Sequence, residues 1–298
     1  MARERTAAGS NPVVGRVAPW APAVGLGWRG PRPGGPEMTE ILLEGIGLGP
    51  EDRVVEIYPG FGETARRIAR ERPRSYTGVC PSPAAADRLA RDLRRDPDLL
   101  TLVTRAETSG HYAGTVSGSA DACPLPDESA NVVVGEFLLT PLNTRDKAAA
   151  LAEAARLLPA GGRLGLHEIC VTPEVPWDEP GAAHRRAAEL REELARPARG
   201  AIHPLVEDDW RSAAEAAGLI VIGARIGPLV PPRLADAVSA IGLTNIPGFL
   251  LRALNGLGSI REVRGLGYAM EAVDELRAIV LVAEKPLLGD VRVGARAD

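Results

Sequence analysis

The stretch DRVVEIYPGFGETA, from Asp52 to Ala65, decides the expected fold. It begins as a short apolar strand that ends in the acid Glu56, continues through a turn with Gly60 and Gly62, and then becomes helical. A parallel strand that enters a helix through a glycine turn brings a ligand close to bare backbone and to the unpaired N–H groups of the helix. The stretch therefore indicates a nucleotide-type site, although a simple turn without a ligand gives the same pattern.

Composition favours small-molecule chemistry. The chain has 298 residues, enough for one large α/β domain with additions, and its 45% hydrophobic and 25% charged residues are ordinary for a globular protein. A net charge of −4 and a pI near 5.7 argue against a nucleic-acid partner, because phosphate neutralisation needs a basic face. No apolar run approaches the roughly 20 residues that span a bilayer, so neither a membrane span nor a signal peptide is expected.

The cysteines Cys80, Cys123 and Cys170 are widely spaced and contain no CxxC pair. This pattern predicts no disulfide framework and no metal site, and it fits a reducing cytoplasm. Two interpretations of the three thiols stay open. They are buried small hydrophobic residues, or they serve thiol chemistry such as methylation of a soft metalloid.

Strands and helices alternate along the chain, which predicts a parallel sheet covered on both faces. We expect a domain over 37–284, preceded by a Gly/Pro-rich leader over 1–36 and followed by a tail over 285–298. The leader is either disordered or a lid pinned by Trp20 and Trp28. An apolar insertion over 227–274 is a helical lid, an association surface or core. The expected strands lie at 54–57, 74–80, 99–103, 131–134, 163–169, 219–226 and 276–283.

Four blocks of sequence carry a family resemblance. They are EIYPGFG, TGVCPSP, DACPLPDESANVVV and LLPAGGRLGLHE, within the segment 37–218. In this order and spacing they resemble class I S-adenosylmethionine (SAM)-dependent methyltransferases of the small-molecule and quinone group. The resemblance implies an α/β fold with a doubly wound, seven-stranded, mostly parallel sheet whose last strand is antiparallel.

The resemblance also implies SAM as cofactor, lying across the carboxyl ends of the strands. Gly60 and Gly62 would let the backbone approach the ligand, and Asp121 with the Ala122 amide would receive the adenine edge. The implied cofactor-binding residues are Glu56, Tyr58, Gly60, Gly62, Cys80, Pro81, Asp121, Ala122, Gly135 and Glu136.

Two of these positions depart from the family pattern. Tyr58 stands where the family has a glycine, and a positive φ there would cost about 1–2 kcal/mol. Its ring would take up space near the ligand or offer a face to the sulfonium cation. Cys80 stands where an acid usually grips the ribose hydroxyls. Loss of such a charge-assisted hydrogen bond costs roughly 1.5–3 kcal/mol, about ten- to a hundredfold in affinity.

Three functions therefore stay open. The first is SAM-dependent methyl transfer to a small-molecule acceptor. The second is a methyltransferase fold that has lost this chemistry and binds another ligand or runs a different reaction. The third is a dinucleotide oxidoreductase, which should show G-x-G-x-x-G after the first strand, whereas this chain lacks the third glycine.

Methyl transfer is an in-line displacement, so the main task of the protein is to align nucleophile, methyl and sulfur. A base is needed only when the nucleophile arrives protonated. His167 and Glu168, at the expected end of the fifth strand, are the candidates, and the alternative for His167 is a strand-end residue that satisfies a backbone group. With 4% aromatic residues, a flat aromatic acceptor held by stacking is not expected. A hydrophobic acceptor and a homo-oligomer are both compatible with the apolar insertion.

Overall fold

The computed structural model describes residues 32–60, 62–172, 181–195, 202–230 and 273–287. Most of the leader, most of the predicted insertion and most of the tail lie outside these residues, and so do Trp20 and Trp28. The predictions of a lid for the leader and for the insertion therefore stay predictions.

The centre of the molecule is a seven-stranded sheet in the order β3-β2-β1-β4-β5-β7-β6. Every neighbouring pair from β3 to β5 is parallel, and β7 runs antiparallel to both β5 and β6. The predicted sheet and its antiparallel last strand are thus confirmed. The strands are β1 (Arg53–Ile57), β2 (Ser75–Cys80), β3 (Ala113–Ser117), β4 (Val132–Glu136), β5 (Arg163–Val171), β6 (Ile220–Pro228) and β7 (Leu276–Glu284).

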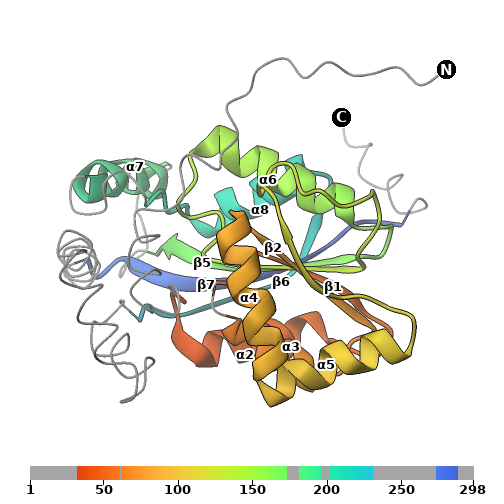
Figure 1. Cartoon of the computed structure of the whole chain (residues 1–298). Coiled ribbons are helices and arrows are strands. Elements are labelled where there is room, and N and C mark those ends of the chain that lie inside the picture. The colour runs from red at the N-terminus through yellow and green to blue at the C-terminus, as the bar shows by residue number, and fades with distance from the viewer. Residues whose placement is uncertain (1–31, 61, 173–180, 196–201, 231–272, 288–298) are drawn as a thin grey trace, which may run out of the picture.

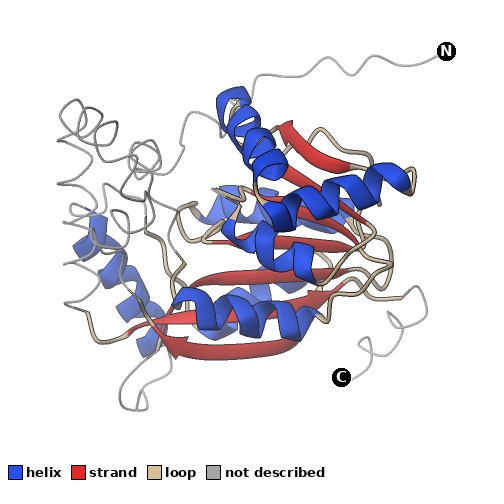
Figure 2. Cartoon of the chain, turned by 60° about the horizontal axis from the view of Figure 1, so that its bottom comes forward, coloured by secondary structure: helices blue, strands red, loops and turns tan. Residues whose placement is uncertain are grey.

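Helices cover the sheet on both faces (Figures 1 and 2). One face carries α6 and α8, and the other carries α2 to α5, so the chain forms three layers. In the described ranges, no helix has the length and apolarity to cross a bilayer. The helices are α2 (Gly35–Ile46), α3 (Glu63–Arg70), α4 (Pro83–Arg95), α5 (Pro97–Thr108), α6 (Thr144–Leu157), α7 (Ala182–Ala195) and α8 (Glu207–Ala216).

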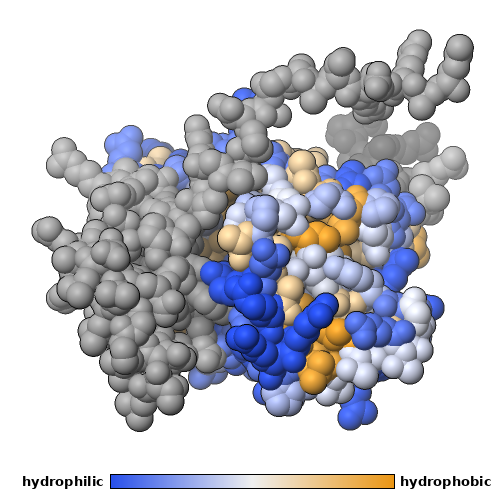
Figure 3. Space-filling model, in the orientation of Figure 1, coloured by the Kyte–Doolittle hydropathy of each residue, from blue (hydrophilic) through white to orange (hydrophobic). Residues whose placement is uncertain are grey.

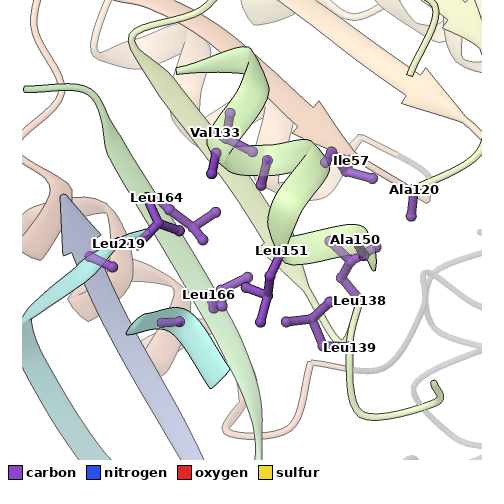
Figure 4. Close-up of a cluster of buried hydrophobic side chains, with 14 of the residues drawn as sticks. Ile57, Ala120, Val133, Leu138, Leu139, Ala150, Leu151, Leu164, Leu166 and Leu219 are labelled. Atoms are coloured by element: carbon purple, nitrogen blue, oxygen red, sulfur yellow. The ribbon is translucent and has the colours of Figure 1, made fainter. Parts of the chain in front are cut away.

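Each face of the sheet has its own apolar core, because successive strand residues point to opposite faces. Val55 and Ile57 of β1 pack beneath α6, where Figure 4 shows Ile57 and Val133 beside Leu151. Val54, the residue before Val55, points to the other side and packs with the helices of the opposite face. The outer surface over α4 is hydrophilic (Figure 3), because this helix exposes arginines to solvent.

The predicted strand at Leu99–Val103 is wrong. This stretch lies in α5, where Leu99, Leu102, Val103 and Ala106 are buried along one helical face. Asp96 caps the helix by accepting hydrogen bonds from the first-turn amides, and Pro97 suits the first position. The third strand is instead Ala113–Ser117, in a segment whose glycine suggested a loop.

Candidate functional site

The carboxyl ends of β2, β1 and β4 lie side by side. Ile57 pairs in register with Val79 on one side and with Gly135 on the other. Tyr58, Cys80 and Glu136 therefore stand at one edge of the sheet, where ligands bind in open α/β folds. Eight of the ten residues predicted to bind the cofactor lie at the ends of these three strands or directly after them, and the other two, Asp121 and Ala122, follow β3.

The turn after β1 has the strained geometry that its sequence suggested. Tyr58 has φ 60°, Gly60 has φ 58° and Gly62 has φ 74°. A side chain at Gly62 would also place a Cβ 2.8 Å from Leu89 of α4. Glycine at 62 is thus required by backbone conformation and by close packing, whereas Tyr58 carries the cost of a left-handed conformation.

The Tyr58 side chain reaches the segment that follows β3. Its hydroxyl accepts a hydrogen bond of 3.1 Å from the Ala120 amide, and burial raises the pKa of the phenol. Next in the chain, the Ser119 hydroxyl donates a hydrogen bond to Asp121, and the Ala122 amide donates one of 3.2 Å to the Ser119 carbonyl oxygen. Asp121 is half-buried and Ala122 is exposed, so the Asp121 carboxylate keeps acceptor capacity on the solvent side.

The three cysteines are free and buried. Burial raises the pKa of Cys80 and of Cys123 to about 12, and that of Cys170 to about 11. Cys170 lies within β5 rather than after it. A thiol of this kind is protonated at neutral pH, so the geometry favours small hydrophobic residues over thiol chemistry. Pro81, directly after Cys80, is half-buried.

Glu56 points into the core rather than toward the turn. Its Oε2 accepts a hydrogen bond of 2.6 Å from the Tyr76 hydroxyl, and the side chain is buried. Burial raises the pKa of Glu56 to about 8, although the Tyr76 hydrogen bond opposes the shift. A predominantly neutral acid at this position supports the turn from beneath.

Glu136, the last residue of β4, is the centre of a group that we name the β4–β5 polar cluster (Arg32, Thr39, Thr64, Glu136 and His167). Its carboxylate accepts hydrogen bonds from Thr39 Oγ1 at 2.5 Å, from Thr64 Oγ1, and from His167 Nδ1 at 2.9 Å. The Arg32 guanidinium lies 3.9 Å away. Burial alone would raise the pKa of Glu136, but the hydrogen bonds from His167 and Thr39 and the charge of Arg32 lower it to about 2.

His167 and Glu168 do not lie at a strand end as predicted, because β5 continues to Val171. Both side chains are fully buried. The Nε2 of His167 accepts from the Gly34 amide at 2.9 Å, so its Nδ1 carries the hydrogen donated to Glu136. As strand neighbours, the two side chains point to opposite faces of the sheet and cannot act on the same substrate atom.

Glu168 holds the loop between β4 and α6. Its Oε1 accepts from the amides of Leu138 and Leu139 at 3.0 and 2.8 Å, and its Oε2 accepts from the Thr140 amide and hydroxyl at 2.7 Å. Burial raises the pKa of Glu168, but all four partners are donors. The ionised carboxylate is the form that satisfies them.

No sequence pattern indicates a role for Lys147, in the first turn of α6, where a lysine is normally solvated. The structure buries it, and its Nζ donates to the carbonyl oxygens of Leu142 at 2.5 Å and His203 at 2.9 Å. It also lies 5.5 Å from the centre of the Trp210 ring. Burial lowers the pKa of Lys147, and the Glu168 carboxylate opposes that shift.

A known protein family matches the part of the chain that contains this edge of the sheet. Residues 55–166 match the family model described as "Methyltransferase domain", and they span the glycine turn, the loop after β3 and the end of β4. Over these residues the chain matches a methyltransferase domain, its sheet has the class I fold, and the resemblance drawn from the four sequence blocks is confirmed.

Individual relatives are distant. An uncharacterized protein of Haemophilus influenzae is 26% identical over 189 residues, which span 63% of this chain and 66% of that protein. A solved structure described as the [4+2]-cyclase SpnF has a TM-score of 0.60 at 18% identity, covering 90% of this chain and 92% of that one. Geranyl diphosphate methyltransferase, solved in complex with SAM, has a TM-score of 0.52 at 13% identity and covers 84% of each chain. At these identities the structural likeness establishes the fold alone.

Proposed function

We propose that this chain is a SAM-dependent methyltransferase that acts on a small-molecule acceptor. One observation carries the proposal. The segment that matches the methyltransferase family, 55–166, is the segment whose turns meet at the carboxyl edge of β2, β1 and β4. That edge is where an open α/β sheet binds its ligand.

The described residues offer groups for each part of SAM. Gly60 and Gly62 leave room for a ligand near the N-terminus of α3. The half-buried Asp121 could accept from the exocyclic amine of adenine. The Ala122 amide could donate to a ring nitrogen only by sharing or leaving its hydrogen bond to the Ser119 carbonyl. The ionised Glu136 supplies a negative charge at the end of β4, where a sulfonium or ammonium group would be stabilised.

The ribose has the weakest support, because Cys80 offers neither a charge nor an exposed thiol. We therefore propose a SAM affinity about ten- to a hundredfold below that of a site with an acid at this position. Tyr58 has a defined role here, since its bond to Ala120 fixes the wall on the adenine side.

For catalysis, His167 and Glu168 stay the proposed candidates, and their contacts favour positioning over proton transfer. His167 orients Glu136, and Glu168 holds the loop after β4. The sulfonium supplies the leaving group, so alignment is the larger part of the task. Turnover that is unchanged in His167→Ala would remove this residue from the mechanism.

The acceptor is proposed to be apolar. Beyond β4, the carboxyl end of β5 and the adjacent amino end of β7 carry an apolar cluster that α7 covers, which includes Phe137, Ile169, Val171, Leu190 and Leu276. A cytoplasmic location is part of the proposal and rests on the three free cysteines.

Calorimetric titration of the purified protein with SAM and with S-adenosylhomocysteine tests the proposal. Saturable heat with both ligands supports it, and no heat at millimolar SAM contradicts it. Native mass spectrometry of the protein as purified would identify a co-purified ligand and give the oligomeric state in the same measurement.

A second function has its own support. Tyr58 spans the turn to Ala120, and Cys80 lacks the ribose-gripping charge, so a ligand other than SAM is compatible with the site. A protein of the same fold is described as a [4+2]-cyclase, which gives a precedent for different chemistry on this architecture. A non-adenosyl ligand in the mass spectrum, together with absent SAM heat, would favour this function.

A further inference from the structure

Helix α6 carries the carboxylate of Glu153 and the guanidinium of Arg156 one turn apart, and both contact the loop after β3. Glu153 Oε1 accepts a hydrogen bond of 2.7 Å from the Cys123 amide. Arg156 donates to the carbonyl oxygens of Cys123 at 3.3 Å and Leu125 at 2.9 Å, and it reaches Asp127 at 2.5 Å. Two residues of one helix thus hold three successive parts of the loop.

Glu153 and Arg156 also form an ion pair with each other. Arg156 Nε lies 2.8 Å from Glu153 Oε2, and its Nη2 lies 2.6 Å from Oε1. The Glu153 side chain is only 9% exposed. A two-point contact with a nearly buried carboxylate fixes the direction of the guanidinium, so its bonds to the loop have a defined geometry.

Asp121 and Ala122 lie immediately before the anchored Cys123. The loop is fixed from two sides, since Tyr58 accepts from the Ala120 amide just before this pair. Neither Glu153 nor Arg156 has a described contact with Asp121 or with Ala122. Any effect of α6 on a ligand must therefore pass through the loop backbone.

We propose that Glu153 and Arg156 are positioning residues for the adenine of the cofactor, because they set the place of Asp121 and the Ala122 amide. This inference rests on the proposed function, since it concerns the same SAM site. The bond between the Glu153 carboxylate and the Cys123 amide fixes the backbone directly after Ala122, and so limits the movement of Asp121 and Ala122.

Glu153→Gln tests the proposal. It keeps the shape of the side chain and removes the charge, and we expect SAM to bind about tenfold more weakly, as for one lost charge-assisted hydrogen bond. Arg156→Lys is the second variant, because lysine keeps the charge but loses the two-point contact. Calorimetry is run where circular dichroism shows each variant to be folded.

Asp52→Asn is the matched control. Asp52 is a carboxylate with 8% side-chain exposure that binds one arginine, Arg163, at 2.6 Å and one backbone amide, that of Gly49, at 2.7 Å. It precedes β1 and so lies at the opposite edge of the sheet. We expect this variant to lose stability and to keep the SAM affinity of the wild type.

A double-mutant cycle with Asp121→Ala separates positioning from general destabilisation. If Glu153 acts through Asp121, Glu153→Gln should weaken SAM binding by less than twofold when Asp121 is already alanine. An unchanged affinity in both Glu153→Gln and Arg156→Lys, beside normal binding by the wild type, would overturn the inference and leave the proposed function intact. Absent binding by the wild type would overturn the proposed function itself.

Discussion

Replacing Glu168 with glutamine should be among the most destabilising single changes in the site. The carboxylate accepts four hydrogen bonds from the loop of Leu138, Leu139 and Thr140. A glutamine has one oxygen to receive them, and its NH₂ group would face donors. The change would also remove the Glu168 charge, which opposes the lowering of the Lys147 pKa by burial.

The expected cost follows from these contacts. Glutamine leaves at least two of the four buried donors without an acceptor, at about 1–3 kcal/mol each, so we expect a cost of about 3–5 kcal/mol. For a chain of this size each kcal/mol lowers the melting temperature by about 2–4 °C, so we expect a decrease of about 6–20 °C for Glu168→Gln. Urea unfolding at pH 7, followed by tryptophan fluorescence, gives the free energy of unfolding directly. An unchanged slope of the unfolding free energy against urea concentration would show that the variant and the wild type have the same unfolded state.

Two further variants make the test specific. Lys147→Met alone should also destabilise, and the double variant should lose less than the sum, with a coupling of about 0.5–3 kcal/mol. As a control, Glu207→Gln removes one charge of a pair with Arg211 whose side chains are about one-third exposed, and it should cost less than about 1 kcal/mol. If Glu168→Gln cost no more than this control, the idea that the buried carboxylate holds the loop would be refuted.

Three more results are expected. Because the folded-state pKa of Glu56 is raised from 4.5 to about 8, the folded state holds an extra proton between these values, and stability should fall as pH rises. Glu56→Gln keeps an acceptor for Tyr76 and should remove this slope of about 1.4 kcal/mol per pH unit in a series of urea unfolding curves. For Glu136 the pH dependence of stability has the opposite sign, because its pKa is lowered to about 2. Its stabilisation is present above pH 4.5 and is lost toward pH 2. Glu136→Gln should abolish this loss of stability at acid pH, and an unchanged acid-side loss in the variant would contradict the ionised state of Glu136. Tyr58→Phe leaves the Ala120 amide without its acceptor and should cost about 1–3 kcal/mol in thermal unfolding, whereas no loss would show that the bond does not stabilise the turn.

The order of strands and helices could be predicted from sequence because each element carries its own period. The apolar runs of β1 and β7 and the glycine turn are local signals, and their combined order matched one family. The strand predicted at 99–103 was wrong because a short, mostly apolar stretch of five residues fits a strand or one helix face equally well. The decisive signal lay just before it, in Asp96 and Pro97, which together start a helix.

The direction of buried polar side chains could not be predicted in the same way. Glu56 was expected at the ligand, yet it points to Tyr76 because β1 places alternate residues on opposite faces and this acid falls on the side of Val54. His167 was expected at a strand end, but β5 runs four residues further and pairs with β7 along its whole length. Such contacts join residues far apart in the chain, and no local pattern records them.

The same reasoning explains how this site accommodates an unusual tyrosine. A left-handed tyrosine costs about 1–2 kcal/mol and persists only where surrounding contacts determine it. Here the loops on both sides of the turn are held from behind, by Glu153 after β3 and by Glu168 after β4. The tyrosine hydroxyl then meets an amide whose position is already fixed. The positions of both loops therefore depend on charged residues of α6 and β5 that lie outside the glycine turn.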